Sequence, residues 1–467
     1  MSTLTGKHLL VLGLGESGLA MARWAALRGA RLRVVDSRAE PPGLAQLQVE
    51  APLAEIRCGE FGAEVLDGIE LVALSPGIDP RHGVVAQARA RGLKIVGELT
   101  LFAHALEELG VREQTRLIAI TGSNGKTTTT TLCAALARAG GVDAVAAGNI
   151  SPAMLDVLME RLELGLPLPA CWVLELSSFQ LELAEDLQAD AATVLNFSAD
   201  HLDRYNSLAD YAAAKARIHV GARVQVLNRE DIPASALAEG AGGELCSFGL
   251  DAAPTAADYG VGRIDGHAWL MRGGLPLLAC EQLKLRGGCN HANALAALAL
   301  CEAALGLDPL QLLEALRTFP GLPHRVCLIG ERADGVSFYD DSKGTNVAAT
   351  EAALQGFNAP LILIAGGEGK DQDFAPLALA LKGRARAVLL IGRAAPQLAA
   401  ALADRDFAVE LCGVLEVAVQ RAAELAQPGE IVLLSPACAS TDQFRNYIHR
   451  GEAFRAAVGT LAGVELK

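Results

Sequence analysis

The sequence predicts an α/β protein with three domains, each built around a mainly parallel sheet. Short apolar runs alternate with Ala- and Leu-rich helical segments along the chain, which is the pattern of repeated strand–helix–strand units. The chain has 467 residues, and a prior of roughly 150 residues per domain gives about three domains. Hydrophobic residues make up 51% and aromatic residues only 4%, which favours helices packed closely on parallel sheets.

Two segments separate the predicted domains. Residues 106–115, LEELGVREQT, form a candidate linker, and residues 318–325, TFPGLPHR, contain too much Pro and Gly to continue a helix. We therefore expect domains at 1–112, 113–320 and 321–467. The second segment is also predicted to be a hinge.

The net charge and the spacing of the cysteines limit the classes of function that the protein can have. The formal net charge of −14 argues against nucleic acid or an anionic membrane as a partner, so an anionic substrate would need a local basic pocket. The ten cysteines form no C-x-x-C pair, as expected for reduced thiols rather than disulfides or structural zinc. No stretch resembles a signal peptide or the roughly 18 uninterrupted apolar residues of a membrane span. We expect a cytoplasmic protein without a membrane partner.

The first domain begins with a glycine-rich strand–helix turn. Strands are predicted at 9–12, 32–35 and 71–74, and the stretch LLVLGLGESGLA has the G-x-G-x-x-G spacing of a dinucleotide site. Asp36 closes the second strand and Ser75-Pro76-Gly77 closes the third. Because the carboxyl ends of parallel strands bind ligands, these residues predict a nucleotide-type site. On this motif alone, a nicotinamide-dependent oxidoreductase remains an alternative.

The second domain begins with a candidate phosphate loop, LIAITGSNGKTTTTT. A strand at 117–120 leads into glycines that let backbone N–H groups approach phosphate, then Lys126, which can reach terminal phosphates, and Thr127, which can ligate magnesium. Ile120 stands where the strict pattern has its first glycine. The alternative is a lysine in an ordinary strand–helix turn.

Three further residues of this domain are candidates for the chemistry. Glu175 lies in an apolar strand predicted at 172–176, where a carboxylate is paired or metal-bound unless the strand lies at an exposed edge. His201 follows the strand predicted at 193–196 and could ligate a metal or cap a turn. Lys215, in a helix near 208–219, is one turn after Tyr211. It is either a desolvated lysine that reacts with carbon dioxide or a surface lysine with a buried stem.

The third domain has strands predicted at 361–365, 387–391 and 431–434. Polar residues follow them or open helices: Asp341, Lys343 and Thr345 in DSKGTN, Lys370 after a glycine turn, and Ser440 in LSPACAS. Each lysine alone also fits a solvated side chain, and the serine fits a helix cap.

Together, TGSNGKTT, LELSSFQL, DHLDRY, LPHR, DSKGTN and LSPACAS resemble, in order and approximate spacing, the motifs of the ATP-dependent Mur ligases of peptidoglycan synthesis. The resemblance covers essentially the whole chain and is strongest to the member that adds glutamate. It implies Rossmann-like first and third domains, a central P-loop ATPase-type sheet, and a phosphate loop that lacks the first glycine. The implied activity is the ADP-forming addition of D-glutamate to UDP-N-acetylmuramoyl-L-alanine through an acyl phosphate, by a monomer.

The resemblance implies a role for each motif. The first domain would bind the UDP substrate, the second ATP, and the third the incoming amino acid, closing on ATP. Contacts to the UDP substrate are expected from Gly15, Glu16, Ser17, Asp36, Ser37, Arg38, Ser75, Gly77 and Asn149. Contacts to ATP are expected from Gly122, Ser123, Asn124, Gly125, Lys126, Thr127, Thr128, Asn293, Arg325 and Asp341. Contacts to the amino acid are expected from Lys343, Thr345, Lys370, Ser440 and Tyr447.

Two magnesium ions are implied as cofactors, held by Thr127, Glu175, His201 and a carbamylated Lys215. Lys126, His201 and Lys215 are the implied catalytic residues, and His201 is a candidate for the base that deprotonates the amino acid. Two departures from the family pattern are Cys289, where a histidine is usual, and DSKGTN instead of DSKATN. The second departure is expected to be mild.

Three other functions compete with this one. A nicotinamide oxidoreductase leaves the phosphate loop without a role, and a regulatory or transport ATPase explains the second domain only. Folylpolyglutamate synthetase also adds glutamate, but its phosphate loop lies near the N-terminus, whereas roughly 110 residues, enough for a domain, precede the loop here.

Overall fold

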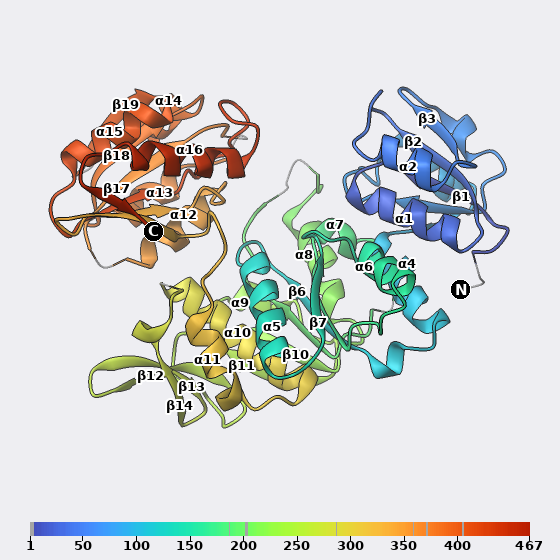
Figure 1. The fold of residues 1–467 in the computed structure, drawn as a ribbon, viewed down its shortest axis with the longest axis horizontal. Coiled ribbons are helices and arrows are strands. Elements are labelled where there is room, and N and C mark those ends of the chain that lie inside the picture. The colour runs from blue at the N-terminus through green and yellow to red at the C-terminus, as the bar shows by residue number, and fades with distance from the viewer. Residues whose placement is uncertain are drawn as a thin grey trace. The chain divides into compact units, whose positions relative to one another are not determined.

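The structure is a computed structural model that describes residues 4–185, 187–200, 204–285, 287–357, 359–369, 372–403 and 406–467. It confirms an α/β fold with three sheets (Figure 1). The chain divides into two compact units, Met1–Ala279 with Asn293–Leu316, and Cys280–Ala292 with Arg317–Lys467. The first unit contains two sheets and the second contains the third. The hinge at 318–325 and the domain boundaries stay predictions.

The N-terminal sheet has the strand order β3-β2-β1-β4-β5 and is parallel throughout. The strands predicted at 9–12, 32–35 and 71–74 are confirmed. Its elements are β1 (His8–Leu12), α1 (Glu16–Leu27), β2 (Arg31–Asp36), α2 (Leu44–Glu50), β3 (Glu55–Cys58), β4 (Leu71–Leu74), α3 (Gly83–Ala90), β5 (Lys94–Val96) and α4 (Glu98–Glu108). The first part of the predicted linker therefore belongs to α4, because Leu106 is buried there.

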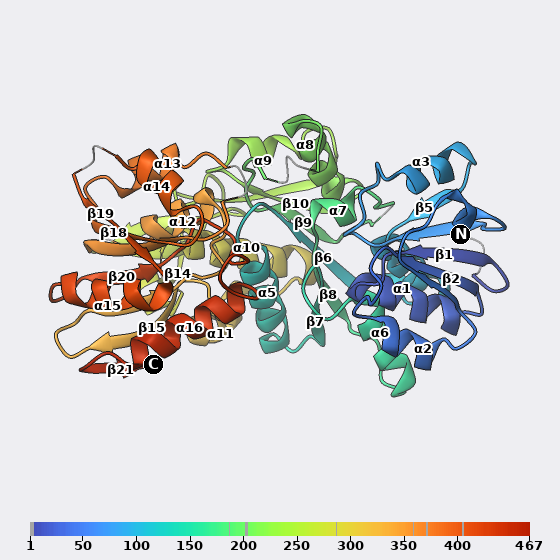
Figure 2. The same ribbon diagram turned by 90° about the horizontal axis from the view of Figure 1, so that it is seen from above.

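Alternate residues of β1 pack on opposite faces of this sheet. Leu9 and Val11 belong to the cluster that contains α1, whereas Leu10 and Leu12 pack with residues of α3. Figure 2 shows α1 and α3 on the two sides of the strands. The chain order reverses at β1, between β2 and β4. In an open sheet this is the place where ligands bind, at the carboxyl ends of the strands.

The central sheet has the order β14-β13-β12-β11-β10-β9-β6-β8-β7, in which β12 to β14 are antiparallel. Its strands are β6 (Arg116–Thr121), β7 (Ala144–Gly148), β8 (Cys171–Glu175), β9 (Ala191–Val194), β10 (Val224–Asn228), β11 (Glu244–Phe248), β12 (Tyr259–Ile264), β13 (His267–Arg272) and β14 (Leu275–Ala279). Its helices are α5 (Lys126–Ala139), α6 (Met154–Glu163), α7 (Ser178–Leu181), α8 (Leu208–Ala216), α9 (Ile232–Ala236), α10 (Gly288–Leu305) and α11 (Leu313–Thr318). The strand predicted at 193–196 ends two residues earlier, because the chain turns after Val194 toward the loop that follows β6.

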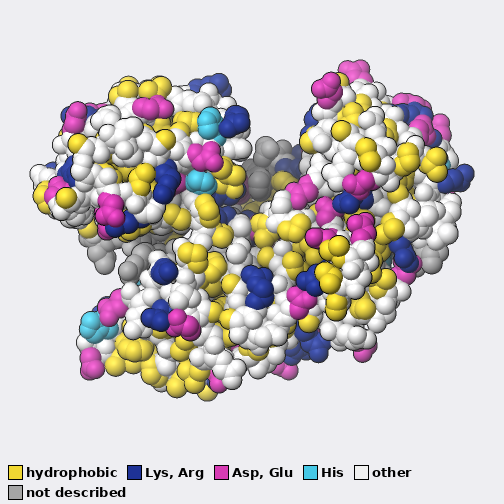
Figure 3. Space-filling model, viewed as in Figure 1, with side chains coloured by type: hydrophobic (Ala, Val, Ile, Leu, Met, Phe, Trp, Pro, Cys, Tyr) yellow, Lys and Arg dark blue, Asp and Glu magenta, His cyan; other side chains and the backbone are white. Residues whose placement is uncertain are grey.

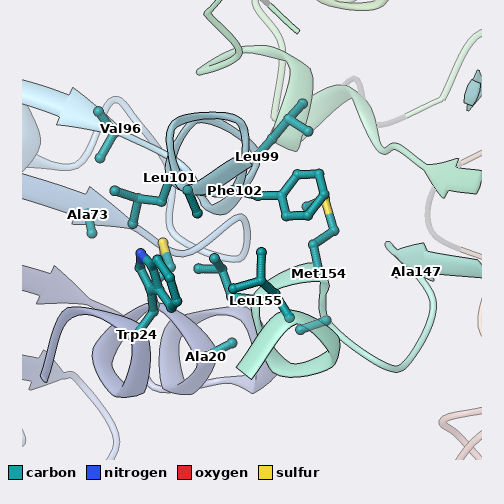
Figure 4. Close-up of a cluster of buried hydrophobic side chains, with 14 of the residues drawn as sticks. Ala20, Trp24, Ala73, Val96, Leu99, Leu101, Phe102, Ala147, Met154 and Leu155 are labelled. Carbon is teal, nitrogen blue, oxygen red and sulfur yellow. The ribbon is translucent and has the colours of Figure 1, made fainter. Parts of the chain in front are cut away.

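Helices α1, α4 and α6 join the two sheets of the first unit through an apolar cluster (Figure 4). Trp24 of α1, Phe102 of α4 and Leu155 of α6 are each at most 1% exposed. The Phe102 ring also packs edge-on against Trp172 of β8, with 4.7 Å between ring centroids. Burying each such side chain contributes about 1.5–3 kcal/mol, so this cluster stabilises the first unit as one body.

The third sheet has the order β19-β18-β17-β20-β16-β15-β21, and only the pairs of β15 are antiparallel. The predicted strands 361–365, 387–391 and 431–434 are confirmed. Its strands are β15 (Cys327–Arg332), β16 (Ser337–Asp340), β17 (Leu361–Gly366), β18 (Ala385–Ile391), β19 (Ala408–Gly413), β20 (Ile431–Leu434) and β21 (Val464–Leu466). Its helices are α12 (Val347–Gln355), α13 (Ala375–Leu381), α14 (Ala395–Ala401), α15 (Leu415–Leu425) and α16 (Tyr447–Gly459).

Both faces of this sheet are covered. Leu361 and Leu363 of β17 pack in the cluster that contains α13, and Ile362 and Ile364 pack in the cluster that contains α15. No helix in the described part of the chain is long and apolar enough to cross a membrane. On the face that Figure 3 shows, acidic and basic side chains are interspersed.

His219 should make the stability of the fold sensitive to acid. Its side chain is fully buried just after α8, neither ring nitrogen has a hydrogen-bond partner in the described part of the chain, and burial lowers its pKa to about 4. The unfolded chain therefore binds a proton near pH 6.5 that the folded chain does not, so stability falls as pH drops from 6.5 toward 4. His219→Leu should reduce that loss by up to about 3 kcal/mol.

The measurement is the urea unfolding midpoint at pH 7.5 and pH 5. The exposed His267 provides the control, and His267→Leu should leave the pH dependence of wild type unchanged. An acid sensitivity of His219→Leu equal to that of wild type would contradict the prediction.

Candidate active site

The three glycines of the first strand–helix turn have different roles. Gly13 has φ +87°, which only glycine adopts without strain. A Cβ on Gly18 would lie 1.9 Å from the carbonyl oxygen of Gly13, so glycine is required for α1 to approach β1. A Cβ on Gly15 would meet nothing within 4 Å, so the backbone there borders open space. The turn thus combines a tight bend, close helix packing and an accessible backbone at a helix N-terminus, where anions bind.

Asp36 organises this turn from the end of β2. Its Oδ2 accepts a hydrogen bond from the Leu14 N–H at 2.7 Å, and both carboxylate oxygens accept from the Arg38 guanidinium, at 2.9 and 2.6 Å. The Arg38 hydrogen bonds are the largest reason that the pKa of Asp36 is lowered, to about 2. The carboxylate therefore stays charged at neutral pH and holds both the glycine turn and a basic side chain in place.

A pocket of about 470 Å³ opens at this edge of the sheet. It includes all nine residues predicted to contact the UDP substrate. It is lined by Gly13, Gly15, Glu16, Ser17, Asp36, Ser37, Arg38, Ser75, Pro76, Gly77, Ile78, Gly148, Asn149 and Gln180. Gly148, Asn149 and Gln180 come from the central sheet's segments, so both sheets of the first unit form the pocket.

The loop between β6 and α5 has the form of a phosphate loop. Gly125 has φ +81°, and a Cβ there would meet Asn293 Oδ1 at 2.6 Å. Asn196, beyond the end of β9, accepts a hydrogen bond from the Asn124 N–H at 2.7 Å and donates to the Asn124 carbonyl at 3.0 Å. The Ser123 N–H donates to the Asn196 carbonyl at 3.0 Å. The predicted loop residues and Asn293 are therefore brought together.

Two lysines converge on one carbonyl of this loop. Lys126 Nζ donates to the Gly122 oxygen at 2.8 Å, and Lys215 Nζ donates to the same oxygen at 2.9 Å. Lys215 is 2% exposed and lies 5.0 Å from the centre of the Tyr211 ring. The surface-lysine alternative is therefore wrong. Burial, and secondly the charge of Lys126, lower the pKa of Lys215 well below its ordinary value.

Glu175 is buried at the end of β8, as its apolar strand predicts, and the exposed-edge alternative is wrong. Its Oε1 accepts a hydrogen bond from Asn149 Nδ2 at 2.9 Å, whereas its Oε2 has no partner within the described residues. A buried carboxylate oxygen without a hydrogen-bond partner can bind a cation, so Glu175 fits the role of a magnesium ligand. Thr127 and Thr128 follow Lys126 in α5, the first half-buried and the second buried.

Two predicted site residues, His201 and Lys370, lie outside the described residues. Their placement is therefore untested. In the described part of the chain, no group of three or more His, Cys, Asp or Glu could hold a metal ion.

In the second unit, Asp341 directly follows β16 and lies beside Ser435. Ser435 Oγ donates to Asp341 Oδ2 at 2.6 Å. Burial raises the pKa of Asp341 to about 7, although Ser435 and the charge of Arg325 act in the opposite direction. Asp341 and Arg325, both predicted to contact ATP, therefore lie close to each other.

The predicted amino-acid contacts of this unit are only partly grouped. Lys343 Nζ lies 3.8 Å from the centre of the Tyr447 ring, and Thr345 follows in the same loop, which ends at Asn346, the N-cap of α12. Ser440 is buried but is not a helix cap, because α16 begins only at Tyr447.

Sequence reasoning missed several residues that hold these loops. Asn196 was the last residue of the strand predicted at 193–196 and was not singled out. Asp340 Oδ2 is 2.6 Å from His324 Nδ1, and His324, in LPHR, was the available signal. Arg450 is fully buried and donates to the Ser342 carbonyl at 2.8 Å and the Cys438 carbonyl at 3.1 Å. It thus connects DSKGTN to LSPACAS, and one arginine among the polar residues of α16 gave no signal of this role.

Comparison with known proteins identifies the family. Three family models match: "Mur ligase MurD-like, N-terminal domain" at 7–97, "Mur ligase middle domain" at 120–301 and "Mur ligase, glutamate ligase domain" at 324–438. A UDP-N-acetylmuramoylalanine–D-glutamate ligase of Aromatoleum aromaticum is 63% identical over 464 residues, covering 99% of each chain. The chain belongs to the Mur ligase family. Another relative of the same name, from Dechloromonas aromatica, is 52% identical over 97% of this chain and 98% of its own.

Solved structures of Mur ligases and related enzymes share the fold. UDP-N-acetylmuramate-alanine ligase MurC from Thermotoga maritima aligns with a TM-score of 0.58 at 21% identity, covering 96% of this chain and 98% of its own. Folylpolyglutamate synthase from Mycobacterium tuberculosis aligns with a TM-score of 0.54 at 19% identity, covering 77% of this chain and 95% of its own. These likenesses support the three-domain α/β architecture.

The two departures from the Mur ligase pattern can be placed. Cys289 is exposed in the first turn of α10, four residues before Asn293. A Cβ on Gly344 of DSKGTN would lie 2.6 Å from Asp341 Oδ2 and 3.0 Å from Ser435 Oγ. The alanine usual in this Mur ligase motif would therefore require the Asp341 carboxylate to move.

Two glycines of this turn provide a matched pair of substitutions that tests their different roles. Gly18→Ala should destabilise the protein by about 1–3 kcal/mol, because its Cβ would collide with the Gly13 carbonyl. Gly15→Ala should cost less than about 1 kcal/mol, because its Cβ meets nothing within 4 Å and only the N-cap preference for glycine is lost. Urea unfolding of both variants provides the measurement, and equal stabilities would contradict the assigned roles of these glycines.

Proposed function

We propose that this Mur ligase adds D-glutamate to UDP-N-acetylmuramoyl-L-alanine, with hydrolysis of ATP to ADP and phosphate. The single observation that carries the proposal is a link between two sites. Asn149 lines the glycine-turn pocket and also donates to Glu175, the acid beside the phosphate loop. A ligand in the pocket would therefore border the site where ATP phosphates would lie. The names of the 63% and 52% identical relatives support the same substrate and amino acid.

The pocket supports the UDP moiety as its ligand. The N-terminus of α1 and the accessible backbone at Gly15 suit a diphosphate. Ser37, Arg38 and Ser75 border the remaining space and would contact the uracil and neighbouring groups. Asp36 would act by holding Arg38 and Leu14. In a nicotinamide-dependent enzyme this acid would bind the ribose, but here its oxygens already accept from protein donors.

The domain assignment belongs to the same proposal. Residues 1–112 would bind the UDP substrate, 113–320 ATP, and 321–467 the glutamate. Ser123, Asn124, Thr128 and Asn293 would surround the nucleotide with the loop glycines. Arg325 and Asp341 would serve ATP, and Lys343, Thr345, Lys370, Ser440 and Tyr447 the amino acid. A cytoplasmic monomer is proposed, and light scattering after gel filtration tests its mass.

Thr127, Glu175, His201 and Lys215 would hold magnesium. Bound there, magnesium would offset the repulsion between phosphate and carboxylate anions. Glu175 offers its Oε2 directly, since this oxygen has no partner in the described part of the chain. Lys215 as an ammonium cannot ligate a cation, and magnesium prefers oxygen ligands to an amine nitrogen. Burial favours the neutral amine of Lys215. A neutral amine attacks carbon dioxide and releases a proton to give a carbamate, which is an oxygen ligand.

The chemistry proceeds in two steps. The alanyl carboxylate attacks the γ-phosphate of ATP, which gives an acyl phosphate and ADP. The amine of glutamate then attacks the acyl carbon, a tetrahedral intermediate forms, and phosphate leaves. Lys126 would stabilise the charge on the transferring phosphoryl group. The amine must first lose a proton, for which His201 stays the candidate base.

The direct test measures phosphate release from ATP with magnesium and UDP-N-acetylmuramoyl-L-alanine, and compares D-glutamate, L-glutamate and no amino acid. Release should require both the UDP substrate and D-glutamate, and mass spectrometry should find the amide product. Release that is independent of both would contradict the proposal. Preference for L-glutamate would contradict the stereochemical part.

Lys126→Met should lower kcat about a hundredfold or more, because the charge that stabilises phosphoryl transfer is lost. Lys94→Met is a matched control, since Lys94 forms a surface salt bridge with Glu185. Its kcat should equal that of wild type. Similar kcat values for the two variants in the phosphate-release assay would exclude the proposed role of Lys126.

Carbamylation of Lys215 is tested by carbon NMR in ¹³C-labelled bicarbonate. Wild type should show a carbamate resonance that Lys215→Arg lacks, because the guanidinium stays protonated and does not react. Depleting carbon dioxide should lower the activity of wild type. If Lys215→Arg shows the same carbamate resonance as wild type, the resonance comes from another group, and the proposal is contradicted.

A further inference from the structure

Glu98 is a buried acid at the contact between the two sheets of the first unit. It is the first residue of α4 and is 1% exposed. Figure 4 shows its neighbour Leu99, together with Phe102, in the apolar cluster that α4 forms with Trp24 of α1 and Leu155 of α6. An acid in the first turn of a helix is ordinarily solvated. A buried one in apolar surroundings is unfavourable unless it has a specific partner or role.

The Glu98 carboxyl accepts a hydrogen bond from the start of α6 and is influenced by a hydroxyl at the start of α1. Its Oε1 accepts a hydrogen bond from the Leu155 N–H in the first turn of α6, at 3.2 Å. The hydroxyl of Ser17, in the first turn of α1, favours its charged form, as does the Met154 N–H. Its Oε2 has no partner within the part of the chain that the structure describes. An unsatisfied buried oxygen costs about 1–3 kcal/mol, so packing stability alone does not explain an acid at this position.

Both helix starts lead directly into the pocket. Ser17 is itself a lining residue. The segment before α6 includes Asn149, which lines the pocket, and Ser151, whose hydroxyl donates to Glu16 Oε2 at 2.8 Å. Glu98 therefore sits behind the glycine turn and behind the segment that carries Asn149.

We propose that Glu98 is a positioning residue for the UDP-substrate pocket and that it takes up a proton when a diphosphate binds there. This inference rests on the proposed function, because it takes the diphosphate of the UDP substrate as the ligand. The chemical class of ligand is a nucleoside diphosphate ester. Glu98 does not touch the ligand and acts through Ser17 and the first turn of α6.

The physical basis is competition between two negative charges. Burial raises the pKa of Glu98 to about 7, more than Ser17 and the Leu155 N–H lower it, so both forms are populated near neutral pH. A diphosphate at the N-terminus of α1, beside Ser17, disfavours a second anion behind the same turn. Binding should therefore be tighter to the protonated form, and affinity should fall as pH rises through 7.

Several other charged groups lie around Glu98 and the helices that hold it. On α6, burial raises the pKa of Asp156, whose charge in turn raises the pKa of Glu98, and the Asp156 carboxylate accepts a hydrogen bond from Arg23 of α1 at 2.6 Å. On α1, Glu16 accepts from Ser151, and after α7, Glu182 pairs with Arg204. His104 lies on α4 itself. In the pocket, Asp36, with a pKa of about 2, stays charged across the range tested.

The experiment measures binding of UDP-N-acetylmuramoyl-L-alanine by isothermal titration calorimetry between pH 6 and 8.5. At each pH, two buffers of different ionisation enthalpy give the number of protons taken up. Glu98→Gln keeps the acceptor for the Leu155 N–H and cannot titrate. Thr100→Val is the matched control, because Thr100 is equally buried on α4 and donates to the Leu183 carbonyl at 2.7 Å without reaching the pocket.

Wild type should take up part of a proton, and its Kd should rise about fivefold between pH 6 and 8.5. Glu98→Gln should take up fewer protons and have a Kd that changes less than about twofold over this range. Thr100→Val should keep the wild-type pH dependence. Wild-type binding without proton uptake, or the same uptake in Glu98→Gln, would overturn the inference. If wild type does not bind the UDP substrate at all, the proposed function fails instead, so the two failures are distinguishable.

Discussion

The arrangement of the candidate active site depends on one carbonyl oxygen, that of Gly122. The side-chain nitrogens of two lysines, Lys126 and Lys215, donate to it from 2.8 and 2.9 Å. Two positive charges this close would repel each other, and one of them would be buried. The neutral form of Lys215 is therefore favoured, which reduces this repulsion. Bringing both to this oxygen requires a tight loop after β6, α5 beginning at Lys126, and α8 packed behind the loop. A phosphate would relieve the remaining repulsion.

A second constraint connects this loop to the glycine-turn pocket. One oxygen of Glu175 accepts a hydrogen bond from Asn149, and the other has no partner among the residues that the structure describes. Asn149 also lines the pocket, so this polar contact within the central sheet connects the acid beside the phosphate loop to the pocket that both sheets form. A ligase that transfers a phosphoryl group between two substrates needs them adjacent, since misplacement of reacting atoms is costly. A rigid unit with both sites supplies that adjacency.

Strands and loop types could be predicted because apolar runs and glycines act locally. The strands predicted in each of the three sheets and the turns at Gly13 and Gly125 follow from that pattern, whereas the antiparallel strands β12 to β14 were not predicted. Burial of Lys215 could not be predicted, since its alanine neighbours suit a surface as well as a core. The end of β9 was misplaced because Asn196 bonds the loop after β6, a contact distant in sequence.

The roles of Glu98 and Arg450 likewise depend on which helices meet, which periodicity does not reveal. The central claim about this protein is that its active site activates a carboxylate by phosphoryl transfer from ATP. The most direct measurement uses UDP-N-acetylmuramoyl-L-alanine labelled with ¹⁸O in its alanyl carboxylate and follows the label into released phosphate. The account predicts one labelled oxygen in each phosphate formed with the amide product. Phosphate without that label would contradict it, because the carboxylate oxygen would not have attacked phosphorus.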